Sequence, residues 1–136
     1  MKKLIIFDLD GTILDTLEDL TDSTNFALSQ NNMPEHTISE VRSFVGNGIR
    51  KLIERAVPQN TSVEVIDKVF ADFKEYYNIH CMDKTKPYTG ITDLMDKLKK
   101  AGYKLAIISN KADDAVQIFT QLYHIFIFFK SLFFVY

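Results

Sequence analysis

The sequence predicts an α/β protein in which a parallel sheet is interrupted by an inserted helical segment. Two short apolar runs, at residues 4–7 and 103–108, have the continuous hydrophobicity of parallel strands that are buried on both faces. Helical patterns flank the second run, as in a parallel α/β layer. The segment between the runs is too long for one crossover. We therefore expect a partial sheet core at 1–14 and 83–136, and an inserted helical unit at 15–82.

The first strand superficially resembles an export signal, because two lysines precede its apolar residues. The apolar run covers only residues 4–7 and ends at Asp8, whereas an export signal needs about 7–15 apolar residues. The chain also lacks the roughly 18 uninterrupted apolar residues of a membrane span. We therefore expect a cytoplasmic protein with no membrane partner.

Four helices are predicted in the inserted unit. The patterns Thr16-x-x-Asp19 and Thr37-x-x-Glu40 fit capping boxes at the starts of the first two, and Pro58 ends the third. Apolar stripes at helical spacing support all four. The stripes are Leu17, Leu20, Ala27 and Leu28; Val41, Phe44 and Val45; Ile49, Leu52, Ile53, Ala56 and Val57; and Ile66, Val69, Phe70, Phe73 and Tyr77.

The second strand is predicted between two further helices. The first of these carries apolar residues at helical spacing and ends at Gly102, while the second begins near Asp113 and Asp114, which favour a helix N-terminus. The apolar positions are Ile91, Leu94, Met95 and Leu98 before the strand, and Ala115, Val116, Phe119 and Leu122 after it.

Charge and cysteine content exclude several classes of function. Lysine and arginine number 16 against 18 acidic residues, so the net charge of −2 gives no electrostatic case for nucleic acid or an anionic membrane as a partner. The single cysteine, Cys81, forms neither an internal disulfide nor a cysteine-rich zinc site. His36, His80 and His124 show no ligand spacing.

Asp8 and Asp10 follow the first strand at the edge where open α/β sheets bind ligands. One carboxylate can attack phosphorus to form an aspartyl-phosphate, and the other can protonate the leaving oxygen and later activate water. Because both would repel a phosphate, the pair predicts a bound Mg²⁺. Gly11 permits a sharp turn and Thr12 offers a hydroxyl and backbone donors. A simple Asp-Gly turn is the alternative, and the presence of Asp8 favours the site.

Residues 7–16 resemble the first signature motif of the haloacid dehalogenase-like hydrolase superfamily, in its phosphatase and phosphomutase branches. The resemblance implies a Rossmann-like core with an inserted helical cap, with Asp8 as the nucleophile and Asp10 as the general acid/base. Residues 107–111 resemble the second motif, in which Ser109 hydrogen-bonds the phosphoryl group. Asn110 and Lys111 complete that predicted phosphate-binding segment, where Lys111 supplies positive charge.

Residues 44–52 resemble the substrate-specificity segment in the cap of phosphoglycolate phosphatase-like members. Gly46 and Gly48 flank Asn47 at a helix start, where the backbone can approach an anionic substrate, and Arg50 lies nearby in the sequence. The alternative is a helix start with permissive glycines and a solvated Arg50. Residues 87–90 resemble the return from cap to core.

The family's later acidic motif, which completes the metal site, is not found. The resemblance covers residues 1 to about 121, and the segment 122–136 carries Phe126, Phe128, Phe129, Phe133 and Phe134 of the 11 phenylalanines. We expect a C-terminally truncated or frame-shifted chain whose apolar tail self-associates.

These features predict a Mg²⁺-dependent phosphatase that hydrolyses small phosphate monoesters through an aspartyl-phosphate, with activity impaired in this chain. Its expected partner is a small phosphorylated metabolite. Two alternatives stay open. One is a sugar phosphomutase, which shares the aspartate pair and the cap. The other is a non-catalytic remnant or interaction module, which the missing acidic motif favours.

Overall fold

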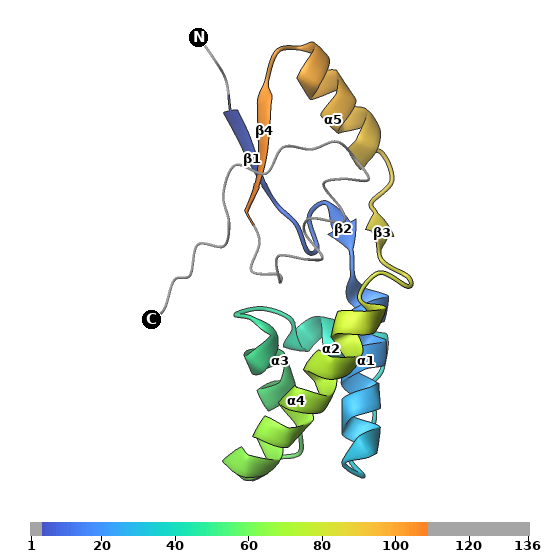
Figure 1. Ribbon diagram of the computed structural model, residues 1–136, viewed down its shortest axis with the longest axis vertical. Helices are drawn as coiled ribbons and strands as arrows, with labels where there is room; N and C mark the ends of the chain where they lie inside the picture. The colour runs from blue at the N-terminus through green and yellow to red at the C-terminus, as the bar shows by residue number, and fades with distance from the viewer. Residues whose placement is uncertain (1–3, 109–136) are drawn as a thin grey trace. The chain divides into compact units, whose positions relative to one another are not determined.

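The computed structural model describes residues 4–108 (Figure 1). It confirms the predicted α/β class. The elements in order are β1 (Leu4–Asp8), β2 (Leu14–Asp15), α1 (Leu17–Gln30), α2 (Ile38–Phe44), α3 (Ile49–Ala56), α4 (Val63–His80), β3 (Lys86–Pro87), α5 (Ile91–Lys100) and β4 (Lys104–Ile108). The chain divides into two compact units: a helical unit, Thr16–Thr85, and a sheet unit with the described residues before and after it.

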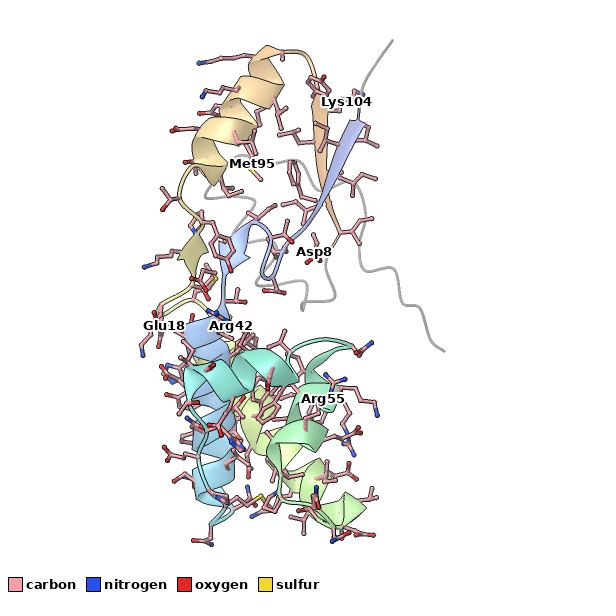
Figure 2. All side chains as sticks on the ribbon, turned by 180° about the vertical axis from the view of Figure 1, so that it is seen from behind. Asp8, Glu18, Arg42, Arg55, Met95 and Lys104 are labelled. Atoms are coloured by element: carbon pink, nitrogen blue, oxygen red, sulfur yellow. The ribbon has the colours of Figure 1, made fainter. Side chains whose placement is uncertain are left out.

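The sheet unit is built on the parallel pairing of β1 with β4. Leu4 lies opposite Lys104 at one end of the pair, and Asp8 lies opposite Ile108 at the other. Helix α5 packs against β4 (Figure 1), and Figure 2 shows Met95 on its strand-facing side. Leu9, Ile13, Leu14, Met95, Leu105 and Ile107 form the buried cluster of this unit. The predicted strand pairing and the helix before β4 are therefore confirmed.

The burial of β1 differs from the prediction. Its side chains alternate, so that Ile5 and Phe7 pack against the apolar cluster while Leu4 and Ile6 are 52% and 48% exposed. A strand presents successive side chains to opposite faces, and α5 is the described helix that packs on this sheet. The expectation of burial on both faces is thus wrong for Leu4 and Ile6.

A second, antiparallel pair joins β2 to β3, which the sequence did not indicate. Leu14 lies opposite Pro87 and Asp15 opposite Lys86. The Tyr88 amide extends this pairing by donating to the Ile13 carbonyl at 3.0 Å. Strands of two residues are too short to leave a hydrophobic pattern, which explains why they were missed.

The helical unit consists of the four predicted helices, α1 to α4. Helices α1 and α4 form its largest contact, and α2 and α3 complete the packing (Figure 1). Its buried cluster holds Leu20, Ala27, Leu28, Val41, Leu52, Ile53, Ala56, Val57, Val69 and Phe73. All ten were predicted in the apolar stripes. Among the helices of residues 4–108, none has the length and apolar character needed to cross a bilayer.

The two predicted capping boxes have opposite outcomes. At α2, Thr37 accepts a hydrogen bond from the Glu40 amide while Glu40 Oε2 accepts one from the Thr37 amide at 2.7 Å, so this box is confirmed. At α1, Thr16 occupies the N-cap position but makes no side-chain capping bond. The box predicted for Thr16 and Asp19 is therefore wrong.

Asp19 fails to form the box because its carboxylate is bound to a distant segment. The side chain is only 2% exposed and accepts hydrogen bonds from the Lys84 amide at 3.0 Å and the Thr85 amide at 2.8 Å. It also accepts one from the Thr85 hydroxyl at 2.7 Å. Asp19 thus joins the start of α1 to the end of the helical unit.

Candidate active site

The candidate site begins where β1 ends, at Asp8 (Figure 2). After Asp8 the chain closes a tight loop, in which the Leu9 carbonyl accepts from the amides of Ile13 and Leu14, both at 3.0 Å. The Gly11 amide donates to the Leu14 carbonyl at 2.9 Å. Gly11 has a φ of 77°, a left-handed conformation that suits glycine and matches the predicted sharp turn.

The two carboxylates of this loop lie outside the apolar core, although the residue between them is part of it. Leu9 lies between them in the sequence and is fully buried. Asp8 is exposed and Asp10 is half-buried. Because Leu9 is held in the apolar cluster, its neighbours are left near the surface at the end of the strand.

The surroundings of Asp8 shift the pKa of its carboxyl. Loss of hydration raises the pKa of its carboxyl above the ordinary value, although the residue as a whole is exposed. A hydrogen bond with the Leu9 backbone lowers this pKa, the negative charge of Asp10 raises it, and a hydrogen bond with the Thr12 side chain lowers it. The net rise makes Asp8 easier to protonate than an isolated aspartate, and it marks a place where a cation would be favourable.

The donor set suits a magnesium ion. Mg²⁺ prefers hard oxygen ligands, keeps several of its waters, and is held in proteins by one or two carboxylates. Asp8 and Asp10 provide two carboxylates close enough for the charge of one to act on the other. Within residues 4–108, no group of three or more histidine, cysteine, aspartate or glutamate side chains gathers to hold a metal.

The structure describes only the first two residues of the second predicted motif, Ile107 and Ile108. The pairing of Asp8 with Ile108 places the last described residue of β4 beside the first carboxylate. Ser109, Asn110 and Lys111 follow Ile108 in the sequence and lie outside the described residues, as do Asp113, Asp114 and the predicted helix after them.

The predicted substrate-specificity segment forms a loop before α3. Gly46, Asn47 and Gly48 have φ values of 124°, 63° and 88°, so three successive residues have positive φ. Gly48 is the N-cap of α3 and offers no side chain to its amides. Loop 46–48 thus has a backbone that requires its two glycines, and a non-glycine residue, Asn47, in the left-handed region.

Arg50 has local partners. It forms ion pairs with Glu54 and Asp67, and its guanidinium lies 5.5 Å from the centre of the Phe70 ring. The hydrogen bonds within these ion pairs raise the pKa of Arg50. The guanidinium therefore links α3 to α4, an engagement that the sequence did not indicate.

Arg55 was not among the predicted residues. It lies in the last turn of α3 (Figure 2) and donates to the carbonyls of Phe44 at 2.7 Å and Gly46 at 3.0 Å, and to Asn47 Oδ1 at 3.3 Å. Residues 48 and 55 are seven apart, which is two helical turns, so they share one face of α3. That spacing is the sequence signal that could have pointed to Arg55.

The sequence and the fold are similar to those of known proteins. The sequence model of a family described as haloacid dehalogenase-like hydrolase matches residues 5–134. The family match extends to residue 134, beyond the expected end at about residue 121, whereas the curated relatives align over 79–85% of this chain. The phosphoglycolate phosphatase of Mesorhizobium japonicum is 39% identical over 113 residues, which cover 81% of this chain and 50% of that protein. The phosphoglycolate phosphatase of Psychrobacter arcticus is 38% identical over 117 residues, covering 81% and 51%.

A solved structure is also similar. The crystal structure of a protein from Haemophilus somnus, described as a predicted phosphoglycolate phosphatase, superposes with a TM-score of 0.79 at 31% sequence identity. The superposition covers 89% of this chain and 57% of that one. The chain spans about half the length of the curated relatives it matches.

Proposed function

Because the chain belongs to the haloacid dehalogenase-like hydrolase family, we propose that the whole protein is a phosphatase that hydrolyses small phosphate monoesters through an aspartyl-phosphate. The observation that carries the proposal is the pair of carboxylates at the end of β1, held near the surface by the buried Leu9 between them. The relatives named phosphoglycolate phosphatase make a small phosphorylated acid the first substrate to test.

The two aspartates have different proposed roles. Asp8 attacks phosphorus with a carboxylate oxygen, and the bond to the ester oxygen breaks. Asp10 gives its proton to that leaving oxygen and then removes one from the water that hydrolyses the aspartyl-phosphate. Hydrogen bonds with the Leu9 backbone and the Thr12 side chain support this assignment, because they lower the pKa of Asp8 and so favour the charged carboxylate that attacks phosphorus.

Asp8 and Asp10 would also hold Mg²⁺. When bound, the ion offsets the repulsion between these carboxylates and the incoming phosphate. The predicted phosphate contacts remain Gly11, Thr12, Ser109, Asn110 and Lys111. The predicted substrate contacts of the helical unit remain loop 46–48 and Arg50. A cytoplasmic location is still a prediction, and so is impaired activity of this chain.

Phosphoryl transfer to Asp8 is the sharpest test. The whole protein is incubated with 2-phosphoglycolate or p-nitrophenyl phosphate and Mg²⁺, quenched in acid, and digested for mass spectrometry of the peptide that contains Asp8. We expect a phosphoryl group on that peptide, none in Asp8→Asn, and a slower turnover by about 10²–10⁴ in Asp10→Asn. Phosphorylation that persists in Asp8→Asn would exclude Asp8 as the nucleophile.

Product analysis separates the alternatives. Release of inorganic phosphate supports the phosphatase, whereas transfer of the phosphoryl group to a sugar phosphate would indicate a phosphomutase. A folded whole protein that is never phosphorylated would contradict the proposal and favour the non-catalytic alternative.

A further inference from the structure

The loop before α3 has an unusual backbone that needs support. Gly46, Asn47 and Gly48 all have positive φ, which glycine adopts freely but which is unfavourable for a non-glycine residue such as Asn47. A conformation of this kind persists when surrounding groups hold it. The helix itself contributes little at this point, because its N-cap residue is a glycine with no side-chain capping bond.

Arg55 provides that support from the other end of α3. Side chains on an α-helix tilt toward its N-terminus, so a long side chain two turns after Gly48 can reach back to the loop. One guanidinium nitrogen donates to the carbonyls of Phe44 and Gly46, and the other donates to the Asn47 side chain. A single planar group therefore joins the last residue of α2, Phe44, to Gly46 and Asn47 of the loop.

The charge of Arg55 differs from that of the neighbouring cations on α3. Arg50 pairs with Glu54 and Asp67, and Lys51 pairs with Glu54. Arg55 donates instead to neutral carbonyl and amide oxygens, and no ion pair joins it to a carboxylate within residues 4–108. Its positive charge is therefore not offset by a paired carboxylate beside loop 46–48.

We propose that Arg55 is a positioning residue for substrate selection, which holds loop 46–48 in the conformation that receives the substrate and supplies the unpaired positive charge of that loop. The proposal rests on the proposed function, in which this loop contacts the substrate. Arg50 has the contrasting role of linking α3 to α4, with its charge offset by Glu54 and Asp67.

The positioning role is tested first, without any ligand. Backbone amide order parameters of residues 46–48 are measured by ¹⁵N relaxation on the 136-residue chain. We expect values near the rigid limit of about 0.85 in the wild type, and below about 0.6 in Arg55→Met. Arg55→Lys should give intermediate values, because it keeps the charge but loses the planar fork. Arg42→Met removes an arginine from α2 as a matched control and should leave the loop unchanged.

Unchanged order parameters in Arg55→Met would overturn the proposal. If Arg55→Met does not fold, Arg55→Lys decides the matter, since loss of order confined to residues 46–48 supports positioning and wild-type values refute it. A purely structural role would instead lower the urea midpoint of unfolding and loosen α3 and α4 together.

Binding of 2-phosphoglycolate in the presence of Mg²⁺ tests the selection role. Amide shifts of residues 46–48 report the apparent Kd. We expect Arg55→Met to weaken binding about tenfold or more, Arg55→Lys to restore part of the loss, and Arg42→Met to match the wild type. Equal affinity of Arg55→Met and the wild type would refute selection by Arg55 and leave the proposed function standing. A wild-type loop that does not respond to the ester would refute the substrate contact itself, and with it selection by Arg55.

Discussion

Replacing the buried carboxylate of Asp19 should destabilise the helical unit strongly. Its oxygens accept from two backbone amides and one hydroxyl of residues 84–85, at 2.7–3.1 Å. A hydrogen bond to a charged group contributes about 1.5–3 kcal/mol, and bonds that share one acceptor group do not add fully. We therefore expect Asp19→Ala to lower the free energy of unfolding by about 2–4 kcal/mol. Asp19→Asn should lower it by about 1–3 kcal/mol, because one oxygen is kept while the new NH₂ group faces donors.

Thermal and urea unfolding followed by circular dichroism measure this loss. For a domain of this size, each kcal/mol corresponds to about 4–8 °C, so the Tm of Asp19→Ala should fall by at least about 8 °C. Asp22→Asn is the matched control. It is the same substitution on the same helix, and Asp22 pairs with the Lys84 side chain, but the Asp22 side chain is 46% exposed. Because an exposed ion pair contributes little to stability, Asp22→Asn should lose much less than Asp19→Asn. Equal losses in the two variants would refute the reasoning.

Three further predictions concern the site, the α2 cap and the tail. In metal-free buffer, ¹³C NMR should show Asp8 titrating above the ordinary pKa of aspartate, and Asp10→Asn should lower that pKa because the charge of Asp10 raises it; an unchanged pKa would mean that the two carboxylates do not interact. Thr37→Ala should cost about 1 kcal/mol of unfolding free energy in urea. Hydrogen bonds from the Thr37 backbone and side chain lower the pKa of Glu40. The stabilisation that the Glu40 carboxylate gives to this capping box is therefore present above the ordinary glutamate pKa, and it is lost as the pH falls through the lowered pKa. A Thr37→Ala penalty that is the same in acid would contradict that sign. Deletion of residues 123–136 should reduce light scattering without restoring activity; a full chain that is already monodisperse would contradict self-association through the tail.

The sequence predicted those elements that leave a recognisable pattern in their own residues. The continuous apolar runs that contain Ile5 and Leu105 match strands β1 and β4, and the stripe ended by Pro58 matches α3. The Thr37 box also depends only on neighbours within one helical turn. Local pattern and structure agree in these cases because the hydrophobic pattern or the cap that marks each element lies within the element or next to it.

The errors arose where the partner is distant. Thr16 and Asp19 have the same spacing as the box at α2. The Asp19 carboxylate instead accepts hydrogen bonds from three donors of residues 84–85, so it does not bond to Thr16. The supporting role of Arg55 likewise depends on carbonyl groups, which every residue carries, so its spacing from Gly48 indicates the helix face that it shares but not the groups that accept its hydrogen bonds. In the candidate site, the two aspartates were visible in the sequence, whereas the loss of hydration that raises the Asp8 pKa depends on packing.

The short pairing of β2 with β3 has an evolutionary consequence. Leu14 lies opposite Pro87 and Asp15 opposite Lys86, so the chain leaves the sheet unit and returns to it at adjacent points. A segment whose two ends are neighbours can be lengthened, shortened or replaced while the strands on either side keep their register. The residues from Thr16 to Thr85 therefore form a segment that can be exchanged between relatives while the parallel pairing of β1 with β4 is retained.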